Sequence, residues 1–111
     1  MYSKIISKMK AKVTNNSSNA NGTCLIGYVT TNYQTLVEKL GEPLTGHSGD
    51  GKVNCEWVVE FNDGSVGTIY DWKMTNTPTE TYNWHVGGRG INVLDKVCKF
   101  LDLPTRKTLF A

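Results

Sequence analysis

The chain lacks several features that would place it at once in a large class of proteins. Among its 111 residues there is no apolar segment close to the roughly 20 residues that a membrane-spanning helix needs. The opening MYSKIISKMK has neither the apolar run nor the cleavage site of a secretory signal, so the NNSS and NGT glycosylation patterns are expected to be unused. We therefore expect no membrane partner and a cytoplasmic location.

Cysteine is also scarce. The three cysteines, Cys24, Cys55 and Cys98, are an odd number, and no two of them have a metal-ligand spacing such as C-x-x-C. This pattern argues against a disulfide framework and against a zinc site, and reduced cysteines in a cytoplasm are the simplest interpretation. We expect no metal and no cofactor.

What is present is enough for one domain with one core. Area scaling for this length gives a folded surface of about 6,000 Å² against roughly 18,000 Å² for the unfolded chain, so about two-thirds becomes buried. An apolar fraction of 39% and three tryptophans indicate an ordered globule rather than a disordered chain.

The net charge of +2 is unevenly distributed. Residues 1–37 carry four lysines and no acid, whereas the remainder carries eight bases and ten acids. A nucleic-acid-binding domain would carry a larger basic excess on its folded body, so the composition disfavours nucleic acid as a partner. The polar TNNSSNANGT (14–23) predicts a loop. We divide the chain into a basic N-terminal arm with a polar loop (1–22) and a single α+β domain (23–111).

The first elements are a strand and a helix. TCLIGYVTT (23–31) is rich in β-formers and predicts a strand, and SKIISKMKAKVT before the polar loop suits a helix or a strand equally. Thr31 and Gln34 form a capping box, while Gly41 and Pro43 end the helix. Between them runs a single apolar stripe: Tyr33, Leu36, Val37 and Leu40.

A hairpin follows in KVNCEWVVEF-NDG-SVGTIYDWK. Its first strand alternates apolar residues onto one face: Val53, Cys55, Trp57, Val59 and Phe61. A two-residue Asp63-Gly64 turn would set Glu56 opposite Asp71, an unfavourable pair of like charges. A three-residue turn that includes Asn62, with a bulge, would relieve this repulsion, and the sequence leaves both turns open.

TETYNWHVG (79–87) predicts a further strand, and INVLDKVCKFLDLP predicts a closing helix with Asn92 as its N-cap. The predicted fold is therefore α+β: an antiparallel sheet of about four strands with two helices packed on one face, in the order β-α-β-β-β-α. An extra N-terminal strand or helix is compatible with this order.

No catalytic template fits the chain. There is no phosphate-binding loop, no H-E-x-x-H and no nucleophile elbow, and the only histidines are His47 and His85. Glu56 and Asp71, with Glu60, could converge as an acidic cluster for metal binding or acid–base chemistry, but the solvated face of a hairpin explains them more simply. We assign no catalytic residue.

The stretch WHVGGRGIN is the better candidate for a site. A glycine-rich turn that leads into a helix N-terminus would offer backbone amides and one guanidinium to an anion, and tryptophans could supply a flat wall for a ring. An ordinary strand-to-helix turn beside sheet-core aromatics is the alternative. The candidate ligand-binding residues are Trp72, Trp84, His85, Gly87, Gly88, Arg89 and Gly90.

Three segments, YQTLVEKLGEP, KVNCEWVVEFNDGSVGTIYDWK and YNWHVGG, resemble the pattern of a family of small, mostly uncharacterised bacteriophage proteins. The shared motifs are L-x-x-x-x-G-E-P, an E-W hairpin with a D-G turn, I-Y-D-W-K and W-H-x-G-G, and they extend over about residues 25–100. The resemblance implies a phage-encoded protein in the host cytoplasm, of a kind that often acts by occupying a host component, frequently one of its defences.

Three hypotheses follow. The first is a non-enzymatic phage accessory protein that binds and blocks a host protein through an exposed aromatic patch around Trp72 and Trp84 or through an unpaired strand edge. The second is a binder that sequesters a nucleotide-type small molecule at the Gly-Gly-Arg-Gly turn. The third is a small enzyme that uses Glu56, Asp71 or His85. Any of these sites could be shared between subunits of a homo-oligomer.

Overall fold

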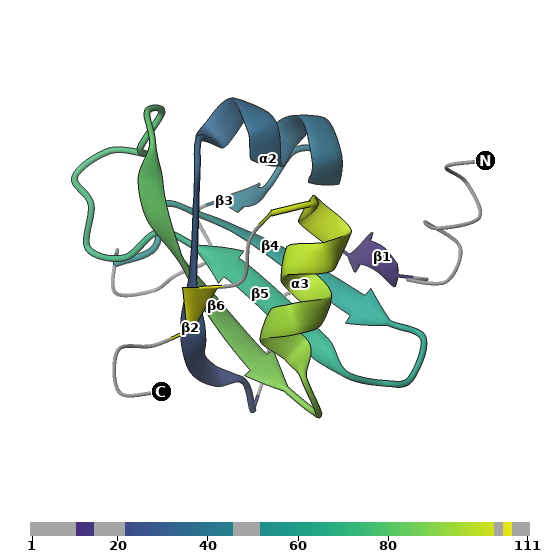
Figure 1. The fold of residues 1–111 in the computed structure, drawn as a ribbon. Helices are drawn as coiled ribbons and strands as arrows, with labels where there is room; N and C mark the ends of the chain where they lie inside the picture. The colour runs from purple at the N-terminus through teal and green to yellow at the C-terminus, as the bar shows by residue number, and fades with distance from the viewer. Residues whose placement is uncertain (1–10, 15–21, 46–51, 104–105, 108–111) are drawn as a thin grey trace.

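The computed structural model describes residues 11–14, 22–45, 52–103 and 106–107. Within these residues the chain forms seven strands and two helices (Figure 1). In chain order they are β1 (Ala11–Thr14), β2 (Cys24–Thr31), α2 (Tyr33–Leu40), β3 (Leu44–Thr45), β4 (Cys55–Phe61), β5 (Val66–Tyr70), β6 (Tyr82–Arg89), α3 (Val93–Leu101) and β7 (Arg106–Lys107). The α+β prediction is confirmed.

The strands form one antiparallel sheet in the order β1-β4-β5-β6-β2-β7, with β3 also paired to β4. Its centre, β4-β5-β6-β2, consists of the four strands that the sequence predicts. Strand β1 pairs with β4, so residues 11–14 belong to the sheet and not to a separate arm, and the strand alternative holds for them. The helix alternative for the preceding residues concerns 1–10, outside the described residues.

Both helices pack on the same face of the sheet, and the core lies between them and the strands. Figure 1 shows α3 crossing that face over β5 and β6, with α2 at one end. Leu36 and Leu40 of α2 and the apolar stripe of α3 join alternate residues of the strands in one buried cluster. The strand members are Val29, Cys55, Trp57, Val59, Phe61, Ile69, Trp84 and Val86.

Two buried indoles fix the position of α2. Trp57 and Trp84 pack edge to face with ring centroids 5.6 Å apart. The Nε1–H of Trp57 donates to the carbonyl of Gly41, just after the helix, at 2.8 Å, and that of Trp84 donates to the carbonyl of Thr31, just before it, at 3.2 Å. Each end of α2 is therefore bonded to a core tryptophan, and both buried indole N–H groups have a partner.

The hairpin has the three-residue turn. Phe61 N donates to Ser65 O at 2.9 Å, and Gly64 has the positive φ of 91° that a bulged turn requires. In this register Glu56 lies opposite Tyr70, not Asp71, so the like-charge pair does not form. The electrostatic argument against the two-residue turn was correct.

The helix caps differ in detail from the predictions. The capping box was wrong, because Asn32 is the N-cap of α2 and its Oδ1 accepts from Thr35 N at 2.8 Å. Asn92 is the N-cap of α3 as predicted, but it has a left-handed backbone and its side chain makes no capping hydrogen bond. Gly41 ends α2 with a φ of 87°, as predicted.

Candidate functional site

The predicted Gly-Gly-Arg-Gly turn is not a turn. Gly87, Gly88 and Arg89 are the last residues of β6, and both glycines are paired with β2 on one side and β5 on the other. Backbone groups inside a ladder of this kind are not presented to a ligand at a helix N-terminus. The prediction of a turn at these residues was therefore wrong, and the pairing of Gly87 and Gly88 argues against an anion site at their amides.

Packing explains the glycines instead. A Cβ atom on Gly88 would lie 2.5 Å from Ile26 Cδ1 and 3.0 Å from Val93 Cβ. On Gly90, whose φ of 117° also favours glycine, it would lie 2.6 Å from Ser65 Cβ. The absence of side chains lets other parts of the chain approach the backbone closely.

Trp84 and Arg89 also differ from their predicted roles. Trp84 is fully buried, so the prediction that it forms a surface wall was wrong: it lies on the core side of a central strand. Arg89 is exposed, and its side chain extends along Gly22. A Cβ atom on Gly22 would lie 3.3 Å from Arg89 Cδ. Of the candidate residues with aromatic rings, Trp72 and His85 lie together, with ring centroids 6.4 Å apart.

These two residues belong to a cluster that we call the aromatic patch: Tyr28, Tyr70, Trp72 and His85. His85 lies directly opposite Tyr28 of β2 and Tyr70 of β5, on the sheet face away from the helices. Its ring centroid is 5.0 Å from that of Tyr28 and 5.4 Å from that of Tyr70, and Trp72 lies 6.4 Å from His85. The four rings form a continuous surface.

Sequence reasoning missed Tyr28 and Tyr70 as members of a site. Tyr28 precedes the core residue Val29, and Tyr70 follows the core residue Ile69. Because side chains alternate along a strand, the sequence of each strand already indicated that its tyrosine points away from the core. Their meeting at His85 depends on the pairing of β2 with β6, which includes a register shift between Leu25 and Gly27. Such a shift has no marker in the local pattern of either strand.

Trp72 is the exposed member of the patch, with 38% of its surface accessible. The ammonium groups of Lys52 and Lys73 lie 5.7 and 5.8 Å from its ring centroid, within the range of cation–π attraction. The backbone N–H of Trp72 donates to Tyr82 Oη at 3.1 Å, which holds the residue against the sheet. The exposed indole is thus positioned and bordered by positive charge.

His85 contributes a neutral ring. Burial lowers the pKa of His85, although the charge of Asp71 acts in the opposite direction. Its Nδ1 is buried and has no hydrogen-bond partner among the described residues. The imidazole is therefore uncharged at neutral pH and serves as an aromatic surface.

Asp71, one residue of the enzyme hypothesis, is a buried hydrogen-bond acceptor for the segment that leads into β4. Asp71 is fully buried, and its carboxylate accepts from Asn54 N and Asn54 Nδ2, both at 2.7 Å, and from Cys55 N at 3.1 Å. Burial first, then the charge of Asp71, raises the pKa of the Cys55 thiol to about 12, which removes it as a nucleophile. Within the part of the chain described, no three His, Cys, Asp or Glu residues could hold a metal ion.

A pocket of about 270 Å³ opens at the sheet edge where β1 and β3 leave a gap along β4. Apolar side chains and two glutamates line it: Val13, Thr14, Leu40, Glu42, Leu44, Glu56 and Trp57. A phosphate in this pocket would face carboxylates, so its chemistry does not suit the nucleotide-type ligand of the second hypothesis.

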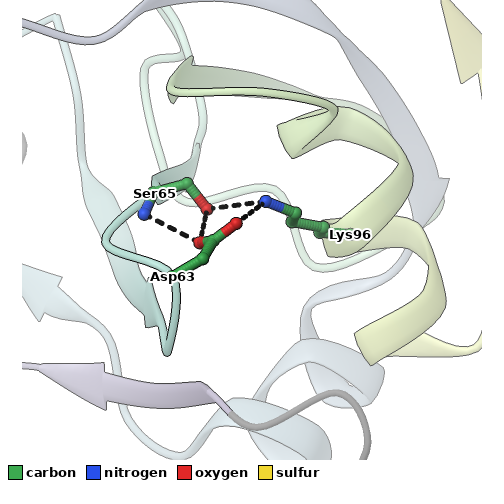
Figure 2. A network of polar contacts seen from close by, with 3 residues as sticks. All are labelled: Asp63, Ser65 and Lys96. Carbon is green, nitrogen blue, oxygen red and sulfur yellow. Dashed lines mark hydrogen bonds and ion pairs between the residues drawn. The ribbon is translucent and has the colours of Figure 1, made fainter.

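A second polar cluster joins the β4–β5 turn to α3 (Figure 2). Lys96 Nζ forms an ion pair with Asp63 and lies 3.0 Å from Ser65 Oγ, which itself donates to Asp63 Oδ1 at 2.6 Å. The proximity of serine and lysine suggests a nucleophile with its base. An ammonium in an ion pair has no electron pair with which to accept a proton, however, so the contact is structural.

This cluster predicts acid-sensitive stability. Hydrogen bonds from Lys96, then from Ser65, hold the pKa of Asp63 well below its ordinary value. Because the folded pKa is the lower one, the stabilisation is complete above the unfolded value of about 3.9 and is lost as the pH falls below it. Asp63→Asn should flatten the dependence of the urea midpoint on pH below about pH 4. Lys96→Met should do the same, and curves parallel to the wild type would contradict the assignment.

Comparison with known proteins finds no match to a protein-family model, to a curated protein sequence or to a solved structure. The structural class of the chain is therefore defined from its own fold and surface. The chain is an α+β protein whose antiparallel sheet carries two helices on one face and an aromatic patch on the other. No helix among the described residues has the length and apolar character needed to cross a membrane.

Proposed function

We propose that the chain is a non-enzymatic accessory protein of the bacteriophage type, which binds a host protein through the aromatic patch and thereby blocks it. The observation that carries this proposal is the unequal burial of the tryptophans. Trp57 and Trp84 are 1% and 0% exposed, whereas Trp72 is 38% exposed. An exposed tryptophan on an ordered surface is the residue type most often found at the energetic centre of a protein–protein interface.

The surroundings of Trp72 support a protein partner. Met74, two residues further along the same loop, is 37% exposed and enlarges the apolar surface. The rings of Tyr70 and His85 stiffen that surface, because strand pairing fixes their positions. A rigid patch of large apolar side chains loses little conformational entropy when it binds. The sequestering alternative has lost the amides and the turn on which it depended.

Affinity capture from host extract tests this proposal. A host protein retained in stoichiometric amount by the wild type should bind Trp72→Ala at least about tenfold more weakly, the loss expected for a central interface residue. Ile91→Ala is the matched control. Ile91 is 76% exposed but lies beyond the other end of β6, so its loss should leave capture unchanged.

Ile91→Ala should melt within a few degrees of the wild type, because Ile91 is 76% exposed. Trp72→Ala should melt at a lower temperature, because its indole packs on Tyr70 and His85, so capture is compared at a temperature at which each variant is fully folded. Equal capture by Trp72→Ala and wild type would contradict the proposal. A nucleotide mixture that raises the melting temperature, without any retained host protein, would favour sequestration of a small molecule instead.

A further inference from the structure

The two lysines beside Trp72 indicate the charge of the group that a partner would present there. Their ammonium groups lie within 6 Å of the indole centroid, at 5.7 Å for Lys52 and 5.8 Å for Lys73. Lys73 N also donates to Lys52 O at 2.7 Å, so a backbone hydrogen bond holds the two residues next to each other. Both side chains are exposed. Two positive charges therefore lie over the indole ring, on residues whose backbones are bonded to each other.

Lys73 occupies this position against its backbone preference. Its φ is 59°, in the left-handed region that costs an ordinary L-residue energy and costs glycine nothing. A glycine would meet the geometric requirement of this turn more easily. What lysine adds here is its ammonium group, and a strained residue at an exposed surface is a common feature of binding sites.

We infer that the partner reaches the aromatic patch through an acidic segment, in which a carboxylate stands beside an apolar side chain. This inference rests on the proposed function and names the chemistry of the partner at the same surface. The carboxylate accepts from the ammonium groups of Lys52 and Lys73, and the apolar side chain packs on Trp72 and Met74. Charge complementarity of this kind fixes orientation and raises the rate of association.

The surrounding charges favour an acidic peptide over nucleic acid. Glu56 lies directly opposite Tyr70, and Glu60 follows four residues further along β4 on the same sheet face. A chain of phosphates extended over this face would meet both carboxylates, whereas a carboxylate confined to the Lys52–Lys73 corner would not. A cationic partner is disfavoured because two ammonium groups already lie at the indole.

Fluorine NMR of the full chain labelled with fluorotryptophan tests the inference directly. The chain gives one resonance for each of its three tryptophans, and loss of a signal in Trp72→Phe identifies that residue. The probes are a short synthetic peptide of alternating glutamate and phenylalanine and a thymidine oligonucleotide of equal charge. We expect the acidic peptide to shift the Trp72 resonance in a saturable manner, with the buried tryptophans unaffected.

The variants separate charge from structure. Lys73→Gly should bind the acidic peptide about fivefold more weakly, the ratio for one partly exposed ion pair, while its melting temperature equals or exceeds that of the wild type. Lys73→Arg should retain binding. Lys52→Gln should weaken it, whereas Lys99→Gln, a change on the exposed side of α3, should not.

Several results would overturn the inference. A Trp72 shift by the oligonucleotide as large as that by the peptide would show a general anion site rather than one for acidic peptides. No shift with either probe would show that the corner does not recognise acidic segments. A host protein captured through Trp72 but equally well by Lys52→Gln and Lys73→Gly would leave the proposed function intact and remove this inference alone.

Discussion

Replacement of Asp71 by alanine is expected to lower the free energy of unfolding by roughly 3 kcal/mol or more. The carboxylate is fully buried and accepts hydrogen bonds from Asn54 N, Asn54 Nδ2 and Cys55 N. Without it, donors in the segment that leads into β4 lose their partner, and an unsatisfied buried donor costs about 1–3 kcal/mol. The effect is therefore large for a chain of this size.

Asp71→Asn provides the graded comparison. The amide retains one acceptor oxygen in nearly the same shape, so it can serve Asn54 N and Cys55 N but presents an NH₂ group to Asn54 Nδ2. We expect Asp71→Asn to lower the free energy of unfolding by less than Asp71→Ala does, as measured by urea denaturation. A loss below about 1 kcal/mol for alanine would show that water replaces the carboxylate without difficulty.

The same prediction separates structure from catalysis at Asp71. Sequence reasoning grouped Asp71 with Glu56 because both are acidic and near each other in the hairpin. Pairing and alternation instead direct Glu56 toward the face of the aromatic patch and Asp71 toward the buried start of β4. Any activity lost in an Asp71 variant should therefore parallel its loss of folded protein.

The fold could be predicted where local pattern and packing agree. Helix α2 lies where its apolar stripe predicts it, because that stripe repeats with the helical period and Gly41 ends the helix with a positive φ. The turn length of the hairpin was left open by the sequence, although the repulsion between Glu56 and Asp71 disfavoured the two-residue turn, and the structure has the three-residue one. The N-cap moved by one residue, from Thr31 to Asn32, because both side chains can cap and only the entry direction of the chain selects between them.

The candidate site was harder to predict, because its features depend on long-range contacts. Trp72 and Trp84 both occur in aromatic, strand-like sequence, yet only Trp84 lies on the core face of a central strand. The glycines before Arg89 have the composition of a turn, and turn and strand differ here only through contacts with other elements. The decisive neighbour, Val93, belongs to α3 and packs directly on Gly88.

The same packing of α3 on the sheet predicts a second large loss of stability, on substitution of Gly67. Gly67 of β5 lies directly opposite Gly88 of β6, and α3 packs over both. A Cβ atom on Gly67 would lie 2.7 Å from Val97 Cγ2 and 3.1 Å from Val93 Cγ1. Gly67→Ala should therefore lower the free energy of unfolding by about 2 kcal/mol, the typical cost of overpacking a core.

A double-mutant cycle distinguishes this clash from a general intolerance of alanine. Val97→Ala alone leaves a cavity and is expected to cost about 2 kcal/mol, but it also removes the Cγ2 atom that the new methyl group would meet. The double variant should therefore lose less than the sum of the single losses, by about 1 kcal/mol. Val29→Ala, a buried change on β2, should add to Gly67→Ala without coupling. Additive losses for Gly67 and Val97 would mean that the cost of Gly67→Ala does not come from the contact between the new methyl group and Val97 of α3.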